Sequence, residues 1–452
     1  MELDEITEIC SQIVELLEEK KFSKAKTLLE QLNPADIALI FDEIEPKDVP
    51  KLYRILNKDI AAMTFSYMDP TKQQELIVAF SDKELRETIN EMYLDDTVDV
   101  IEEMPANVVD RILRNIDPQT RKTLNELLNY PEDSAGSIMT TEYVSLKKEM
   151  TVEQAFAHIR SDGVNKETVY TCYVTDNRKL IGLVTVKDLL LSKYEDIIED
   201  IMETNVIYVD THEDQEVVAN MFNKYDFLAL PVVDKEERLV GIVTVDDAMD
   251  VMQEETEEDI EAMNAILPSD KPYIRTGVFE TWKKRIPWLL LLMISATFTG
   301  KIIQGFESAL ESCVILTSFI PMLMGTGGNA GSQASVTIIR SLSMDEIDFG
   351  DTFKVLWKEF RVAFLCAFTL GVIGFFKAWL IDGANPTEAL VVTITLSLSV
   401  VVAKLIGCLL PIIIKKIGLD PAVVVSPFIT TIIDAVALLI YFNIAALILP
   451  GL

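Results

Sequence analysis

Long apolar runs in the last third of the chain constrain its fold more than any other feature of the sequence. Five runs, at 286–303, 313–339, 362–381, 389–414 and 422–449, are each close to or above the ~20 residues that a helix needs to cross a bilayer. Such a chain is not a purely soluble enzyme, a disordered chain or a secreted disulfide scaffold. We therefore expect residues 285–452 to form a five-helix transmembrane domain.

The charged residues are distributed unevenly along the chain. Asp and Glu number 72 and Lys and Arg number 40, which gives a net charge of −32. The last 172 residues hold 11 Asp and Glu against 12 Lys and Arg, so the whole acidic excess lies in the first 280 residues. Because carboxylates repel a phosphate backbone, nucleic acid is not an expected partner.

Cysteine and histidine are too scattered for a zinc or iron–sulfur site. The five cysteines lie far apart, and neither a CxxC nor a Cys/His spacing occurs with the two histidines. The abundant carboxylates instead suit hard cations that prefer oxygen ligands. Magnesium or calcium is therefore the metal that this chain is expected to handle.

Residues 1–135 have the pattern of an all-α domain. Ile6, Ile9 and Ile13 recur at helical spacing. Further on, proline recurs before apolar stretches, mostly after a polar residue, which is how a capped helix with proline at its first position begins. The pairs are Asn33-Pro34, Glu45-Pro46, Asp69-Pro70, Met104-Pro105 and Asp117-Pro118. We predict short helices stacked into a superhelical array, with an ordinary globular helical domain as the alternative.

A clearer repeat of about 60 residues occupies the middle of the chain. Ile138-Met139-Thr140 opens one unit and Ile201-Met202-Glu203 opens the next, and GLVTVKD at 182–188 and GIVTVDD at 241–247 close them. Each unit is expected to fold as strand, helix, strand, strand and helix. The paired endings resemble a tandem pair of α/β CBS domains. We place these domains at 136–200 and 201–256. A long acidic connecting helix follows at 257–284, broken by Pro268 and Pro272.

Basic residues near the ends of the apolar runs predict the orientation in the membrane. Nine lie on one side: Lys283, Lys284, Arg285, Arg340, Lys354, Lys358, Arg361, Lys415 and Lys416. The other side has Lys301 and Lys377. Because basic residues concentrate in cytoplasmic loops, the acidic part is expected in the cytoplasm and the C-terminus outside. The first residues, MELDEITEIC, also lack the features of a signal peptide.

Asp434 is the sharpest candidate for a functional residue. It lies near the middle of the fifth apolar run, one turn after Thr430 and Thr431. A carboxylate in hydrocarbon costs several kcal/mol, so it should face a water-filled path or a partner. The alternatives are a protonated Asp434 bonded to a neighbouring helix, or an ion pair with Lys404 in the fourth run.

The second apolar run is unusually rich in small and polar residues. It contains GTGGN at 325–329, and Gly331, Ser332, Gln333 and Ser335 follow. Glycines at membrane depth are tolerated where freed carbonyls line a cavity or where backbones pack closely. Both roles, or close packing alone, fit this run. Glu359, just before the third run, is either at the mouth of a pathway or an ordinary interfacial carboxylate.

These residues together resemble the MgtE family of magnesium channels and transporters. The resemblance covers almost the whole chain and is most specific at 325–329 with Gln333, and at 420–422 followed by 427–434. It implies a homodimer in the cell membrane that is not an enzyme and that conducts Mg²⁺ inward, with Asp434 holding the hydrated ion. Magnesium keeps several waters and binds one or two carboxylates, which suits a single aspartate.

The resemblance also implies the residues that line the pore. They are Gly325, Gly328, Asn329, Glu359, Ser426 and Thr430. Ser426 departs from the asparagine of the family, and Lys404 is not part of the family pattern.

A Mg²⁺ sensor among the acidic residues is a further implication of the resemblance. Carboxylates packed together repel one another, and divalent ions that bridge them favour a compact form that closes the pore. The matching positions are Asp95, Gly136, Asp214, Asp226, Asp247, Asp250, Glu255, Glu258 and Asp259. Glu91 replaces an aspartate of the family. Each acid alone is also compatible with a solvated surface position.

CBS pairs often hold adenine nucleotides, and the resemblance implies ATP as a possible ligand. Its contacts would be Tyr170, Lys187, Asp188 and Phe227. A purely structural CBS pair is the alternative.

Two other functions fit parts of the sequence. One is an ion- or proton-coupled secondary transporter of another divalent cation or of an anion, working through Asp434 and Lys404. The other is a membrane anchor for a CBS sensor, which would not need an intramembrane carboxylate.

Overall fold

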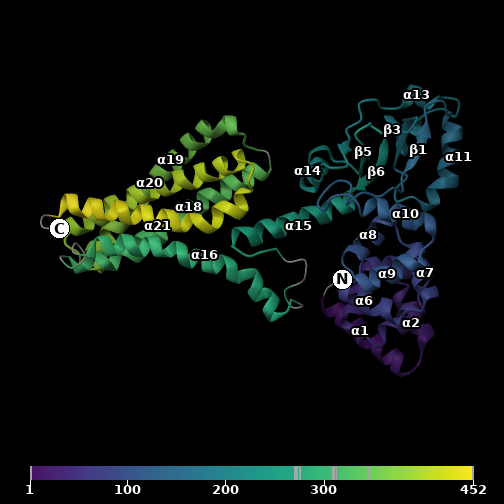
Figure 1. Ribbon diagram of the computed structural model, residues 1–452, viewed down its shortest axis with the longest axis horizontal. Coiled ribbons are helices and arrows are strands. Elements are labelled where there is room, and N and C mark those ends of the chain that lie inside the picture. Colours follow the sequence, from purple (N-terminus) through teal and green to yellow (C-terminus); the bar gives the residue numbers. More distant parts are fainter. Residues whose placement is uncertain are drawn as a thin grey trace. The chain divides into compact units, whose positions relative to one another are not determined.

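The computed structural model describes residues 3–268, 273, 276–307, 311, 313–344 and 346–449. The chain divides into two compact units, Met1–Met252 and Gln253–Leu452. In Figure 1 the first unit contains short helices and two small sheets, and the second contains long helices. Each unit is described by itself below.

The first unit begins with a series of short helices. They are α1 (Leu3–Glu18), α2 (Phe22–Leu29), α3 (Pro34–Glu43), α4 (Val49–Tyr53), α5 (Lys58–Ser66), α6 (Pro70–Ala79), α7 (Asp82–Glu91), α8 (Leu94–Glu102), α9 (Ala106–Asn115) and α10 (Pro118–Leu127). Asn33, Asp69 and Asp117 cap α3, α6 and α10, because each side chain accepts a hydrogen bond from a backbone N–H in the first turn. Three predicted helix starts are thus confirmed.

Two of the predicted helix starts differ from the structure. After Glu45-Pro46 the chain makes a turn, and α4 begins only at Val49 with Asp48 before it. At Met104-Pro105 the proline precedes the helix instead of occupying its first position. The side chains of Glu45 and Met104 do not cap a helix in the structure. Without a capping side chain, the proline alone was a weaker signal for a helix start.

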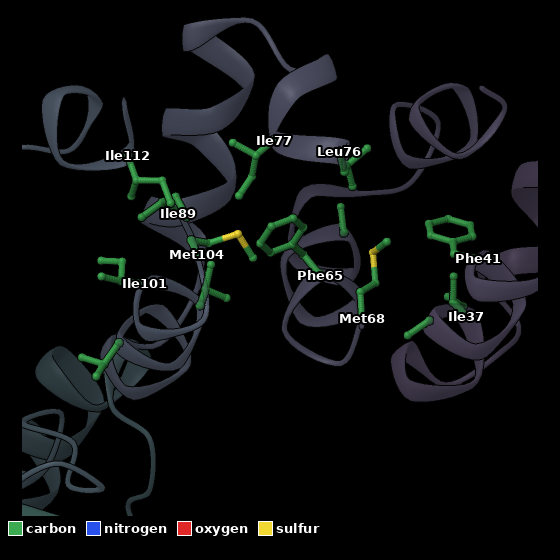
Figure 2. Packing of buried hydrophobic residues seen from close by; sticks show 14 of the residues in the cluster. Ile37, Phe41, Phe65, Met68, Leu76, Ile77, Ile89, Ile101, Met104 and Ile112 are labelled. Atoms are coloured by element: carbon green, nitrogen blue, oxygen red, sulfur yellow. The ribbon is translucent and has the colours of Figure 1, made fainter. Parts of the chain in front are cut away.

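These helices stack, as predicted for the N-terminal domain. Along the stack α3 packs against α1 and α5, and α7 packs against α5 and α9. One apolar core runs through it. Figure 2 shows part of this core, in which Phe65 lies between Met104, which follows α8, and Leu76 of α6. Phe41 and Phe65 are fully buried.

Two small three-stranded sheets follow. The first contains β1 (Val144–Lys147), β2 (Thr171–Asp176) and β3 (Lys179–Thr185); the second contains β4 (Val209–Asp210), β5 (Ala229–Val233) and β6 (Leu239–Thr244). In each sheet the first two strands are parallel and the last two antiparallel. The helices are α11 (Val152–Asp162), α12 (Val186–Leu191), α13 (Ile198–Ile201), α14 (Gln215–Tyr225) and α15 (Val245–Met263). Both repeats therefore have the predicted order of strands and helices.

The opening segment of each repeat pairs with the closing strand of the other repeat. Thr140 and Ile242 exchange two backbone hydrogen bonds, with N–O distances of 2.8 and 2.9 Å. Leu183 and Glu203 do the same at 3.0 and 2.9 Å. The two repeats are thus joined by reciprocal strand pairing, which the repeat in the sequence did not reveal.

This pairing explains why a glycine begins both closing motifs. A Cβ atom on Gly182 would lie 2.7 Å from Met202 Sδ, and one on Gly241 would lie 2.5 Å from Met139 Sδ. Each opening methionine therefore packs on the glycine of the other repeat, and a side chain at that glycine has no room.

The acidic connector expected at 257–284 is not one continuous helix in the structure. Its first residues continue α15, which begins at Val245 and ends at Met263. Ala265 then has a positive φ of 58°, which ends a helix, and Pro268 follows. The next helix, α16 (Val278–Gly305), starts before the expected beginning of the transmembrane domain.

The second unit is a bundle of long helices. Besides α16 it contains α18 (Ile320–Ser343), α19 (Thr352–Phe376), α20 (Pro386–Lys416) and α21 (Pro421–Ile448). In this bundle α20 packs against α18, α19 and α21, and α16 and α18 also pack against α21. Figure 1 shows the antiparallel course of α19, α20 and α21.

The number of candidate spans is four rather than the expected five among the residues that the structure describes. By length and composition, Val278–Gly305, Phe349–Ile381, Pro386–Lys416 and Phe428–Ile448 can cross a membrane. The expected second run, 313–339, instead begins with a 3₁₀ segment, Val314–Phe319, and continues as α18. The glycines and polar side chains of α18 lower its mean hydropathy, although it packs within the bundle.

Candidate ion pathway and acidic cluster

Glycines bring α18 into close contact with α21. A Cβ atom on Gly327 would lie 3.2 Å from Ile433 Cγ2, and one on Gly331 would collide with Ile433 Cδ1. On its other side Gly331 faces Gly407 of α20, whose Cβ would collide with the Gly331 carbonyl oxygen. Gly327 and Gly331 therefore serve close helix packing, which is one of the two roles expected for the glycines of the second run.

Asp434 lies at the middle of α21, beside the same glycine face. The Cβ position of Gly328 is 3.8 Å from Asp434 Oδ1 and 3.7 Å from Thr430 Cγ2. Asp434 is half-buried, whereas Thr430 is exposed. In the part of the chain that the structure describes, Asp434 has neither an ion-pair nor a hydrogen-bond partner.

Lys404 does not pair with Asp434. Its Nζ lies 2.9 Å from Oε1 of Glu359 on α19, and the two side chains are 7% and 16% exposed. The structure therefore overturns the alternative in which Lys404 neutralises Asp434. It also places Glu359 in an ion pair between α19 and α20, where a second charge compensates it.

The remaining predicted pore residues lie on α18 and α21. Gly325 and Asn329 are exposed on α18, one turn apart. Ser426 is in α21, and its side chain lies outside the part of the structure that is described. The structure thus brings Gly328, Thr430 and Asp434 together. Glu359 instead pairs with Lys404.

An acidic cluster forms in the first unit where α8 meets the CBS repeats. It contains the predicted Asp95 and Asp247 and five further acids whose charges act within the cluster: Asp96, Asp99, Glu142, Glu167 and Asp246. Glu142 joins the two parts, since its Oε2 accepts a hydrogen bond from the Leu94 N–H at 3.2 Å.

Burial and mutual repulsion raise the pKa values of these carboxyls. Burial and the charge of Asp96 raise the pKa of Asp95 to about 7, and burial and the charge of Asp95 raise that of Asp247 to about 7. Burial, together with Asp95, raises the pKa of Glu167 to about 9. One Glu167 oxygen, Oε2, is buried without a hydrogen-bond partner. Such a cluster favours the binding of protons or cations.

Sequence reasoning missed five members of this cluster, among them Asp99, one turn after Asp95 on α8. Asp96 and Asp246 are direct neighbours of predicted residues, so paired aspartates were a usable signal. Glu142 and Glu167 are brought together by the backbone hydrogen bond from Glu167 N–H to Glu142 C=O, 2.9 Å long. No spacing in the sequence encodes that contact.

The other predicted sensor residues are more dispersed. Gly136 lies beside the loop before α14, since its N–H donates to the Thr211 carbonyl at 3.0 Å. Asp214 caps α14 and Asp226 ends it in a left-handed conformation. Asp250 is an exposed residue as a whole. Partial burial of its carboxyl group, together with the charge of Asp246, raises its pKa.

Three predicted sensor acids follow on the part of α15 in the second unit. Glu255 and Asp259 are half-buried and one turn apart, and Glu258 is exposed. Within the described ranges, no group of three or more His, Cys, Asp or Glu side chains is arranged to hold a metal ion.

The candidate nucleotide residues are partly assembled. The Tyr170 carbonyl accepts a hydrogen bond from the Val186 N–H at 3.0 Å, which places Tyr170 beside Lys187 and Asp188 at the start of α12. Asp188 Oδ2 already accepts from Thr185 N–H at 3.1 Å. Phe227 stacks on Tyr225 at 5.3 Å. Tyr170 is exposed and available for stacking.

Comparison with known proteins agrees with this architecture. A family model described as "Divalent cation transporter" matches residues 320–444, "MgtE intracellular N domain" matches 32–133, and "CBS domain" matches 135–194 and 198–254. The matched families and the long apolar helices thus define the class as multi-pass divalent-cation transporters with a CBS pair.

Two relatives cover nearly the whole chain. The magnesium transporter MgtE of Thermus thermophilus is 37% identical over 97% of this chain and 98% of its own length, and that of Bacillus subtilis is 32% identical over 97% of each. The chain belongs to the MgtE family. Among solved structures, the cytosolic domain of the Mg²⁺ channel MgtE in complex with ATP is 36% identical, with a TM-score of 0.51, and matches 54% of this chain and 99% of its own.

Proposed function

We propose that this protein transports Mg²⁺ across the cell membrane, into the cell and down its electrochemical gradient. The observation that carries the proposal is Asp434, a half-buried carboxylate at the middle of a candidate membrane helix, with no ion-pair partner among the described residues. A carboxylate in that position is costly unless it faces water or a cation. Membership of a family whose relatives are named magnesium transporters supports Mg²⁺ as that cation.

Hydrated Mg²⁺ suits this site because the ion keeps most of its waters when a protein binds it. Asp434 would accept hydrogen bonds from those waters, and Thr430, one turn away, would contribute a hydroxyl. A negative-inside potential favours entry by roughly 4.6 kcal/mol per 100 mV for a divalent ion. In this proposal α18 also crosses the membrane and brings the number of spans to five. Its glycine face and the exposed Asn329 border the pathway together with α21.

The proposal includes closure of the pathway by cytosolic Mg²⁺. The acidic cluster would bind divalent ions, which would relieve the repulsion among its members: Asp95, Asp96, Asp99, Glu142, Glu167, Asp246 and Asp247. Gly136, Asp214, Asp226, Asp250, Glu255, Glu258 and Asp259 would contribute to further sites. In the proposed orientation this acidic part is cytoplasmic and the C-terminus is outside.

Homodimerisation and ATP binding complete the proposal. The family resemblance supports the dimer. The ATP complex of the related cytosolic domain supports a nucleotide at Tyr170, Lys187, Asp188 and Phe227. A coupled transporter using an Asp434–Lys404 relay is not favoured, because Lys404 is paired with Glu359.

Flux through the purified chain in liposomes tests this function. With Mg²⁺ outside and an indicator inside, we expect flux that follows the membrane potential and needs no proton or sodium gradient. Raising Mg²⁺ on the side of the acidic domains should reduce flux. Flux that requires a second ion gradient would contradict the channel, and flux insensitive to Mg²⁺ on either side would contradict the gate.

A further inference from the structure

An apolar groove lies between α19 and α20 and is open to the outside of the bundle. Its volume is about 510 Å³, within the roughly 300–1,000 Å³ typical of ligand sites. Four residues of α19 line it, from Phe353 to Phe360, and four of α20, from Val402 to Leu409. All eight are apolar, and Trp357 stacks on Phe360 with a centroid distance of 5.8 Å.

A second hollow shares Phe360 with this groove and has a cation in its wall. It is formed by Phe360, Arg361, Phe364 and Leu365, with a volume of about 450 Å³. Lys354, Lys358 and Arg361 follow the i, i+4, i+7 spacing and form one stripe along α19, next to the apolar stripe. Lys358 and Arg361 are exposed, and within the described residues neither has a carboxylate partner.

The length of the α19 segment places this basic stripe at the level of lipid head groups. The continuous helical segment Phe349–Ile381 has 33 residues, about 50 Å at 1.5 Å per residue, against ~30 Å of hydrocarbon. About a dozen residues therefore lie beyond the hydrocarbon. At the opposite end Lys377 is neutralised by Asp382, 2.7 Å away, so uncompensated positive charge remains at the Phe349 end.

We propose that the α19–α20 groove binds one anionic phospholipid, with an acyl chain along Trp357 and Leu409 and the phosphate at Lys358 and Arg361. The apolar wall matches the chain, and the unpaired cations match the negative head group. A second copy of this protein fits less well, because a symmetric contact through this face would bring the same cationic stripe of both copies together. The inference is independent of the ion that the protein carries.

Tryptophan quenching tests this site directly, because Trp357 lies in the groove. The other tryptophans, Trp282, Trp288 and Trp379, are replaced by Phe, and the full chain is placed in phosphatidylcholine nanodiscs. Brominated phosphatidylglycerol should quench Trp357 with a saturable curve at mole fractions where brominated phosphatidylcholine quenches only in proportion to its amount. K358Q/R361Q should weaken the phosphatidylglycerol effect about 25-fold, at about fivefold per cation.

K377Q is the matched control, since it removes a cation from the opposite end of the same segment and should leave the curve unchanged. Equal quenching by both lipids, or an unchanged curve in K358Q/R361Q, would overturn the proposal. Absence of quenching by either lipid would mean that protein covers the groove and would overturn it as well. If the triple tryptophan replacement does not fold, native mass spectrometry can compare the phosphatidylglycerol that stays bound to the unmodified chain and to K358Q/R361Q. The proposal expects less bound lipid in the variant, and equal amounts would overturn it.

Discussion

Lys404 Nζ and Glu359 Oε1 lie 2.9 Å apart and form a nearly buried ion pair between α20 and α19. The lysine therefore does not pair with Asp434, for which the described residues provide no ion-pair partner. In the proposed function the Glu359–Lys404 pair is therefore structural, and Asp434 is the residue that meets the cation.

Removing one partner of this pair should destabilise the protein. Lys404→Met leaves Glu359 buried without its cation, which typically costs about 3–5 kcal/mol. The double variant Lys404→Met/Glu359→Gln should recover most of the loss, because neither charge remains. Denaturant unfolding in detergent measures both effects. A single variant as stable as the unmodified chain would mean that the ion pair contributes nothing.

Close packing of α18 on α21 should make Gly331 intolerant of a side chain. Gly331→Ala places a methyl group against Ile433 Cδ1 and should lower the melting temperature by several degrees. Ile433→Val, which removes that methyl, should restore part of the loss. Gly325→Ala is the control, because nothing lies within 4 Å of its Cβ position. Equal effects of the two alanine substitutions would argue against the packing.

The CBS repeats should be equally sensitive at their recurring glycines. Gly241→Ala would collide with Met139 and with the Thr140 carbonyl, so a loss of about 1–3 kcal/mol is expected. Met139→Ala in the same chain should relieve only the side-chain collision. Protease resistance of the first unit in the full chain is a suitable measure. Full resistance of Gly241→Ala would contradict the reciprocal pairing.

The acidic cluster should make stability fall as pH rises. Asp95 and Asp247 have folded pKa values of about 7, whereas an unfolded Asp titrates near 3.9. The folded chain therefore holds protons that the unfolded chain releases, and stability decreases from about pH 4 to pH 7. In thermal melts without Mg²⁺ the slope should shrink in Asp95→Asn/Asp247→Asn. A slope identical in the variant would exclude these two residues as its source.

Mg²⁺ should reverse this effect where the carboxyls are ionised. Added Mg²⁺ is expected to raise the melting temperature at pH 8 and to do so much less at pH 5.5, where protons occupy Asp95 and Asp247. Glu75→Gln, an exposed position on α6, is the control and should keep the full response. A response equal at both pH values would contradict binding at the acidic cluster.

Much of the architecture was predictable because it depends on local patterns. Asn33, Asp69 and Asp117 before proline marked helix starts, and the repeated GΦVTV motif marked two similar α/β units. The span count was harder, since the residues that let α18 pack closely, such as Gly327 and Gly331, also lower its hydropathy. Length and polarity alone could not separate a packed membrane helix from a weak candidate.

The candidate sites were predictable only in part because they depend on tertiary contacts. Asp434 was recognisable from its apolar surroundings in the sequence. The partner of Lys404 was not, since Glu359 is 45 residues away and belongs to another helix. Glu142 and Glu167 joined the acidic cluster through a loop contact that has no sequence signature.

The most direct test of the account is Mg²⁺ flux through Asp434→Asn in liposomes at a fixed negative-inside potential. The amide keeps the shape of the side chain and removes its charge. We therefore expect flux to fall at least 100-fold, which corresponds to a loss of about 2.7 kcal/mol or more in binding the ion. The size-exclusion profile and the melting temperature should remain those of the unmodified chain. Flux close to that of the unmodified chain would contradict the role of Asp434.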